Sequence, residues 1–134
     1  MPGSIPGRRG AVLLRVEGAL RFVPASTVLR VAPAPRVTPV PGAPAELLGI
    51  TTYEGTVVPV IAIGASRREM VVCQHAGEIV GLVGGEVVKT GMFDVAGGEP
   101  DALEHEGERA RIVDIARPYT QIQNTSRTRP IAGR

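Results

Sequence analysis

Four dipeptides ending in glycine divide the chain into short apolar segments and constrain its fold more than any other feature. They are Glu17-Gly18, Glu54-Gly55, Ala76-Gly77 and Glu106-Gly107. Each lies between two short runs rich in Val, Leu and Ile. Glycine in a two-residue loop adopts the positive φ angles that tight hairpin turns need. The pattern therefore predicts four β-hairpins.

The composition between these turns also favours strands. Val is the dominant apolar residue, aromatic residues make up only 3% of the 134, and Trp is absent. β-Branched side chains pack well on pleated sheets. No segment has a sustained helical period, so we expect an all-β protein without an α-helix longer than about three turns. Two hairpins lie on either side of a polar break at residues 64–69, which predicts two small β units meeting there.

The two ends of the chain differ from its centre. Residues 1–10 are rich in Gly, Pro and Arg and are expected to be disordered. Residues 117–134 lack apolar periodicity and are expected to form a flexible basic tail. The folded domain is then predicted over residues 11–116. Within it, the proline-rich stretch 33–44 excludes a helix and predicts an irregular connection.

The charge and the single cysteine limit the classes of function. The net charge is only +2, and much of the excess Arg lies near the two ends. The alternative of an SH3-like barrel that binds nucleic acid therefore depends on the tails, and deletion of residues 117–134 would test it. Cys73 alone cannot form an intrachain disulfide. No signal peptide or apolar run long enough for membrane insertion is found, so we expect a cytoplasmic protein.

The motifs that could carry chemistry are incomplete. The glycine-rich stretch 81–90 has Val88 where a phosphate-binding loop needs Gly before its Lys. Cys73, His75 and His105 do not supply the four ligands of a closed zinc site. The carboxylates cluster at hairpin turns, where they are usually solvated. We therefore predict no catalytic residue, no metal, no cofactor and no small-molecule substrate.

Three motifs in the first half of the chain resemble one family in order and spacing. Residues 37–41 read Val-Thr-Pro-Val-Pro, residues 49–55 read Gly-Ile-Thr-Thr-Tyr-Glu-Gly, and residues 59–63 read Pro-Val-Ile-Ala-Ile. CheW-like domains typically have Ile-Thr-Pro-Leu-Pro, then Gly-Val-Ile-Asn-Leu-Arg-Gly, then Pro-Val-Ile-Asp-Leu. A weaker similarity covers residues 79–87, and the last hairpin suits the family's closing strands. The resemblance extends over roughly residues 11–116.

The resemblance implies a fold and a function. The fold would be two small SH3-like five-stranded barrels that share an apolar core. The function would be that of a non-enzymatic adaptor or scaffold of a bacterial chemosensory array, whose partner is the cytoplasmic tip of a methyl-accepting chemoreceptor. Contact with a CheA-type histidine kinase, or with another CheW-like protein, is left open.

Matching positions imply site residues, and some of them depart from the family. Receptor binding is implied for Val28, Arg30, Thr52 and Glu54, and kinase binding for Gly49. Arg30 stands where the family often has Glu, and Glu54 where it has Arg. We therefore expect these two side chains to form an ion pair with exchanged charges.

The segment before the second half of the domain is also shorter than the family's, which commonly has a longer stretch with helical character here. Only residues 64–68 stand in its place. The departures resemble a short divergent paralogue, such as the small CheW-like protein of a Frz-type gliding-motility system. A shorter segment removes a surface that kinase-side partners would use. We therefore expect receptor binding with weak or absent kinase binding.

Overall fold

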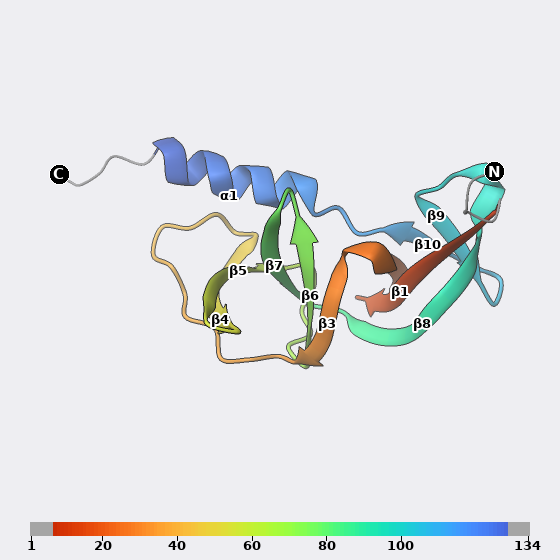
Figure 1. Ribbon diagram of the computed structural model, residues 1–134, viewed down its shortest axis with the longest axis horizontal. Coiled ribbons are helices and arrows are strands. Elements are labelled where there is room, and N and C mark those ends of the chain that lie inside the picture. Colours follow the sequence, from red (N-terminus) through yellow and green to blue (C-terminus); the bar gives the residue numbers. More distant parts are fainter. Residues whose placement is uncertain (1–6, 129–134) are drawn as a thin grey trace.

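The computed structural model describes residues 7–128, with side chains as far as residue 122. Strands dominate, and one α-helix lies at the carboxyl end of the described chain (Figure 1). The elements in chain order are β1 (Arg8–Val16), β2 (Ala19–Pro24), the 3-10 turn η1 (Ala25–Thr27), β3 (Val28–Pro33), β4 (Leu47–Tyr53), β5 (Thr56–Ala62), β6 (Glu69–His75), β7 (Glu78–Val83), β8 (Glu86–Val95), the 3-10 turn η2 (Ala96–Gly98), β9 (Ala102–His105), β10 (Glu108–Ile112) and α1 (Ala116–Thr128).

The predicted all-β fold with two five-stranded units is confirmed. Strands β1, β2, β10, β9 and β8 close into a barrel, and the other five strands form a sheet in the order β3-β6-β7-β5-β4. The barrel lies at one end of the molecule and the sheet at the other (Figure 1). An apolar cluster that contains side chains from both units confirms the predicted shared core.

All four predicted hairpins form at the predicted dipeptides. Both residues of each turn have positive φ, for example 49° and 87° at Glu17-Gly18 and 53° and 81° at Ala76-Gly77. These are the angles of the turns whose twist matches that of antiparallel strands. The glycine in the second position relieves the strain that any other residue would add there.

The division of the chain between the two units differs from the prediction. Residues 64–69 do not separate the units, because β5 before them and β6 after them lie in the same sheet. The barrel instead combines the first two strands with the last three. Hairpin turns are local signals, whereas the choice of a neighbouring sheet depends on pairings between distant strands. Residues 64–69 nevertheless lie at the spatial junction of the two units, beside Gly84.

The observed ends of the folded domain also differ from the predicted ends at residues 11 and 116. Strand β1 begins at Arg8, within the segment expected to be disordered, because residues 8–10 pair with β8. Helix α1 occupies much of the predicted tail and, with 13 residues, exceeds three turns. Residues 1–6 and 129–134 of the two predicted end segments lie outside the described residues.

Tertiary packing explains why α1 forms in a polar sequence. The carboxylate of Asp114 accepts a hydrogen bond from the Arg117 N–H and caps the helix. Tyr119 is buried in the shared core and Ile122 packs against it. The Tyr119 hydroxyl donates to Glu78 Oε1 at 2.9 Å, and its ring contacts His75 edge-on. Most helix stability in proteins comes from such packing rather than from intrinsic propensity.

A close backbone approach fixes the place where the chain crosses from the sheet into the barrel. Ile63 N–H donates to the Val83 carbonyl at 2.7 Å, and a Cβ added at Gly84 would overlap the backbone of Gly64. Gly84 also has a φ of 125°. Only glycine meets both the steric and the conformational requirement here.

We expect Gly84→Ala to destabilise the fold more than Gly55→Ala. Both positions have positive φ, so each substitution adds strain of roughly 1–2 kcal/mol. Only Gly84 adds a backbone overlap, which should cost about 1–3 kcal/mol more, because a Cβ at Gly55 meets nothing within 4 Å. Urea unfolding of both variants measures the difference. Equal losses of stability would contradict the close approach.

A second prediction concerns pH. Arg15 and Glu108 join β1 to β10 through two hydrogen bonds of 2.6 and 3.1 Å. These bonds hold the pKa of Glu108 below its ordinary value of 4.5. The contribution to stability is therefore present above pH 4.5 and is lost as the pH falls through the lowered pKa.

We expect Glu108→Gln to be less stable than the parent protein at pH 7. The difference should shrink as the pH falls below 4.5, and urea unfolding from pH 7 to pH 2.5 measures it. Glu104→Gln is the control, since Glu104 makes no ion pair in the described part of the chain. A pH-independent effect at Glu108 would disprove the assignment.

Candidate functional site

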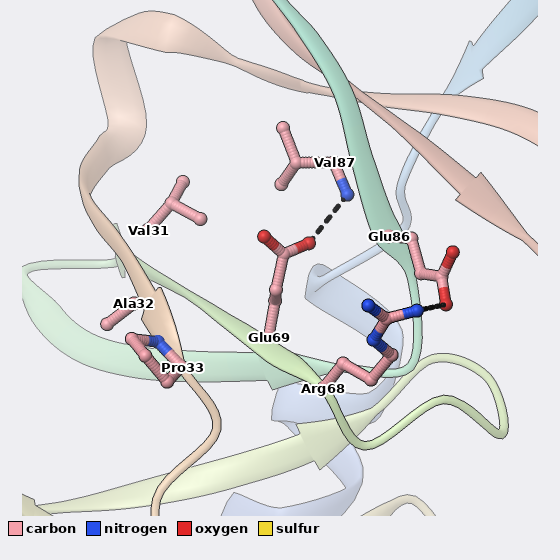
Figure 2. A pocket seen from close by; sticks show the side chains of 7 residues that line it. All are labelled: Val31, Ala32, Pro33, Arg68, Glu69, Glu86 and Val87. Carbon is pink, nitrogen blue, oxygen red and sulfur yellow. Dashed lines mark hydrogen bonds and ion pairs between the residues drawn. The ribbon is translucent and has the colours of Figure 1, made fainter.

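The junction of the barrel and the sheet contains a groove between two strands that have free edges. It has a volume of about 410 Å³. We call it the junction groove, and it is lined by Val31, Ala32, Pro33, Arg68, Glu69, Glu86 and Val87. In Figure 2, β3 forms one wall, β8 forms the other, and Glu69 lies between them.

Each wall has an edge without a neighbouring strand. Strand β3 pairs only with β6 and is an edge of the sheet. Strand β8 pairs with β1 along most of its length, but with β9 only at Asp94 and Val95. One side of β8 next to the groove therefore has no strand partner. Free edges leave backbone groups available to a partner.

The same two strands carry most of the exposed apolar surface. Five large apolar side chains are exposed in the described part of the chain. Leu29 (47%) and Val31 (37%) lie on β3, Val88 (45%) and Met92 (48%) lie on β8, and Val57 lies on β5. Of these side chains Val31 lines the groove itself, whereas Met92 lies farther along β8 near Phe93. Exposed apolar side chains at a groove mark binding surfaces. The groove and its flanking strands are thus suited to bind an apolar or amphipathic partner.

Polar groups define the floor and the rim of the groove. Glu69 Oε1 accepts a hydrogen bond from the Val87 N–H at 2.8 Å. Arg68 Nη1 and Glu86 Oε2 form an ion pair of 3.5 Å at the rim. Figure 2 shows both contacts linking the start of β6 to the start of β8.

The reactive side chains considered from the sequence are engaged elsewhere. Cys73 is fully buried in the shared core, and burial raises the pKa of its thiol to about 11. His75 contacts the ring of Tyr119 and His105 contacts that of Phe93. Among residues 7–128, no three potential metal ligands converge. None of these three side chains lines the junction groove.

Two of the implied receptor-binding residues lie on a wall of the groove. Val28 and Arg30 are both in β3, opposite Cys73 and Val72 of β6. Val28 is half-buried and packs against the shared core, whereas Arg30 is exposed. Neither lines the groove itself. The residues of β3 that line the groove are the next three, Val31, Ala32 and Pro33.

The other two lie at the opposite edge of the sheet. Thr52 is in β4 and Glu54 is in the turn after it. Because β3 and β4 are the two edge strands, no hydrogen-bonded register brings Glu54 to Arg30. The predicted ion pair between these side chains is absent from the described contacts, so that prediction is wrong.

Gly49 is buried, and its role in the fold is steric. Thr38 and Ile50 exchange two backbone hydrogen bonds of 2.8 and 2.9 Å, which bring the proline-rich segment onto β4. A Cβ at Gly49 would overlap the Thr38 carbonyl. Gly49 therefore shapes the surface around β4 rather than presenting a side chain to a partner.

Sequence reasoning named none of the residues that line the groove as a site residue. Arg68 and Glu69 adjoin β3 through its pairing with β6, whereas Glu86 and Val87 reach the groove only because the barrel meets the sheet. The polar break at residues 64–69 marked the position of Arg68 and Glu69, but not their function. Nothing in the sequence separates exposed Val88 from the buried Val residues of neighbouring strands.

The fold and the groove define a class: a small β protein of two five-stranded units with a groove at their junction. A family model described as the CheW-like domain matches residues 10–117. The chain therefore belongs to the CheW-like domain family. The match ends near the start of α1, so most of that helix lies beyond it.

Comparison with solved structures supports the same fold. The chain is similar to the scaffolding protein TtCheW from Thermoanaerobacter tengcongensis, with a TM-score of 0.67 and 16% sequence identity. The alignment covers 85% of this chain and 88% of that chain. No curated protein matches the sequence. Between residues 7 and 128, no helix has the length and apolar character needed to cross a membrane.

Proposed function

We propose that this protein is a non-enzymatic adaptor of a bacterial chemosensory array that binds the cytoplasmic tip of a chemoreceptor. Membership of the CheW-like family supports the adaptor role. The observation that carries the proposal is the junction groove, which exposed Val31 lines and whose two wall strands carry three further exposed large apolar side chains outside its lining. An adaptor of this kind acts in the cytoplasm, where receptor tips lie.

The physical form of the groove suits a protein segment better than a small molecule. It is bounded by strands rather than enclosed, and the polar side chains at its floor and rim already bond to one another or to backbone. Small-molecule sites usually bury most of the ligand and offer convergent polar groups. Amphipathic protein segments instead place apolar anchors in open grooves and leave their polar side in water.

The first test places a charge in the groove. We expect Val31→Asp to weaken binding of a soluble chemoreceptor tip fragment by about tenfold or more, because a carboxylate would replace an apolar contact. Val31 is already 37% exposed, so the fold should tolerate the change. Calorimetric titration measures the affinity.

Val57→Asp is the matched control. Val57 is also exposed and apolar, at 64%, but it lies on β5 and does not line the groove. It should bind the fragment like the parent protein. Equal loss in both variants, or no loss at Val31, would place receptor binding outside the groove.

The proposal extends to the second partner: this adaptor binds the receptor but binds the CheA-type kinase weakly or not at all. The support is the connection between β5 and β6, which contains only residues 63–68 and forms no helix. Ile63 and Gly64 in it are packed against the crossing at residues 83–84. So short a link offers little additional surface to a partner.

Calorimetry against the isolated kinase regulatory domain tests this point. We expect no measurable heat of binding under conditions in which the receptor tip fragment binds. An affinity in the micromolar range or tighter would disprove receptor-only binding, while leaving the receptor proposal intact.

A further inference from the structure

Both groove walls rest on the shared core, on which Val28 of β3 and Val87 of β8 pack, and two short connections join the strands of the two units in the described chain. One is η1, between β2 and β3, and the other is Gly84-Gly85, between β7 and β8. Glycines impose little conformational restriction of their own. The close packing of Gly84 on Gly64 fixes the crossing itself.

Glu69 contacts both walls of the groove. Its backbone is the register partner of Pro33 at the end of β3, and the preceding Arg68 carbonyl accepts from the Ala34 N–H at 3.0 Å. Its side chain reaches the other wall, where Oε1 accepts from the Val87 N–H of β8 at 2.8 Å. Figure 2 shows the carboxylate between the two walls.

The hydrogen bond to Val87 replaces a missing strand. At this position β9 does not pair with β8, which it joins only at Asp94 and Val95. Val87 is half-buried, and a backbone N–H removed from water needs an acceptor. A carboxylate is a strong one, because bonds to ionised acceptors are stronger than those between neutral groups. The Glu69 side chain thus serves as the neighbour that this edge of β8 lacks.

We propose that Glu69 is a positioning residue that holds the β3 and β8 walls at the separation required by the partner. It acts through the two walls and not by direct recognition of the partner's sequence. The inference deepens the proposed function and rests on it for the identity of the partner. The position of the walls can be measured without any partner.

The ion pair between Arg68 and Glu86 provides a matched control. It links Arg68, the residue before Glu69, to Glu86 of β8 at the same groove, but its side chains are 78% and 50% exposed. Exposed ion pairs are screened by water and contribute little. Loss of Glu86 should therefore leave the walls in place, whereas loss of Glu69 should not.

The first experiment measures the distance between the β3 and β8 walls directly. Spin labels at Arg30→Cys on β3 and Lys89→Cys on β8 report the separation by pulsed electron resonance. Both parent side chains are exposed, while the native Cys73 is fully buried and should remain unlabelled. We expect Glu69→Ala to broaden or shift the distance distribution. Glu69→Gln keeps an oxygen acceptor and should preserve the distribution, as should Glu86→Gln.

Hydrogen exchange of the Val87 amide checks the bond itself. In Glu69→Ala this amide should exchange about tenfold faster than in the parent protein, while amides of β6 and β7 keep their protection. Uniformly faster exchange would indicate general destabilisation. That result, or an unchanged distance distribution in Glu69→Ala, would overturn the positioning role.

The second experiment measures affinity for the receptor tip fragment with unlabelled proteins. Glu69→Ala should bind about tenfold more weakly, and Glu69→Gln and Glu86→Gln should bind like the parent. A changed distance between the walls in Glu69→Ala, together with an unchanged affinity for the fragment, would refute the proposal. A parent protein that does not bind the fragment would refute the proposed receptor function instead, and the distance measurement would still decide whether Glu69 positions the walls.

Discussion

The largest of three apolar clusters lies between the barrel and the sheet and holds the two units together. Val12, Leu14, Val16 and Val23 of the barrel meet Ile61, Val71, Cys73, Val80 and Leu82 of the sheet, with Val113 and Tyr119 from the carboxyl-terminal part. Small units bury too little surface to be stable alone. Sharing one core therefore links the stability of each unit to its position against the other. The junction groove lies at the surface where the two units meet.

The sequence predicted local structure well and long-range topology poorly. Each hairpin turn could be located because a tight turn depends on two adjacent residues, such as Ala76-Gly77. The pairing of β1 with β8 joins residues that are distant in the chain, and no local pattern encodes it. Helix α1 was missed although Ile115, Tyr119 and Ile122 have the i, i+4, i+7 spacing of a helix face. Three apolar residues among Thr, Gln and Asn were too weak a signal, and only packing on the shared core explains why the helix forms.

The candidate site shows the same contrast between local patterns, which the sequence reveals, and long-range contacts, which it does not. Motif matching led to β3, where Val28 and Arg30 lie beside the groove. It also led to β4, the other edge of the sheet, where Gly49, Thr52 and Glu54 lie. The groove itself could not be predicted, because it exists only where residues 31–33 meet residues 86–87 across the junction. Its exposed valines have the same side chain as the core valines, so hydropathy does not distinguish them.

The two edge strands of the sheet differ in whether another segment of the described chain covers them. This difference supports the choice of the junction groove as the candidate site. At β4 the proline-rich segment covers the edge through the Thr38–Ile50 bridge. The N–H and carbonyl of Ile50 both bond to Thr38 and so point away from Pro59, its register partner in β5.

At β3 no segment of the described chain covers the edge, and Leu29 and Val31 remain exposed. Free edges with apolar side chains invite aggregation unless they are covered. In the described chain β4 is covered and β3 is open beside the groove, and this asymmetry supports the proposed binding site over the opposite edge of the sheet.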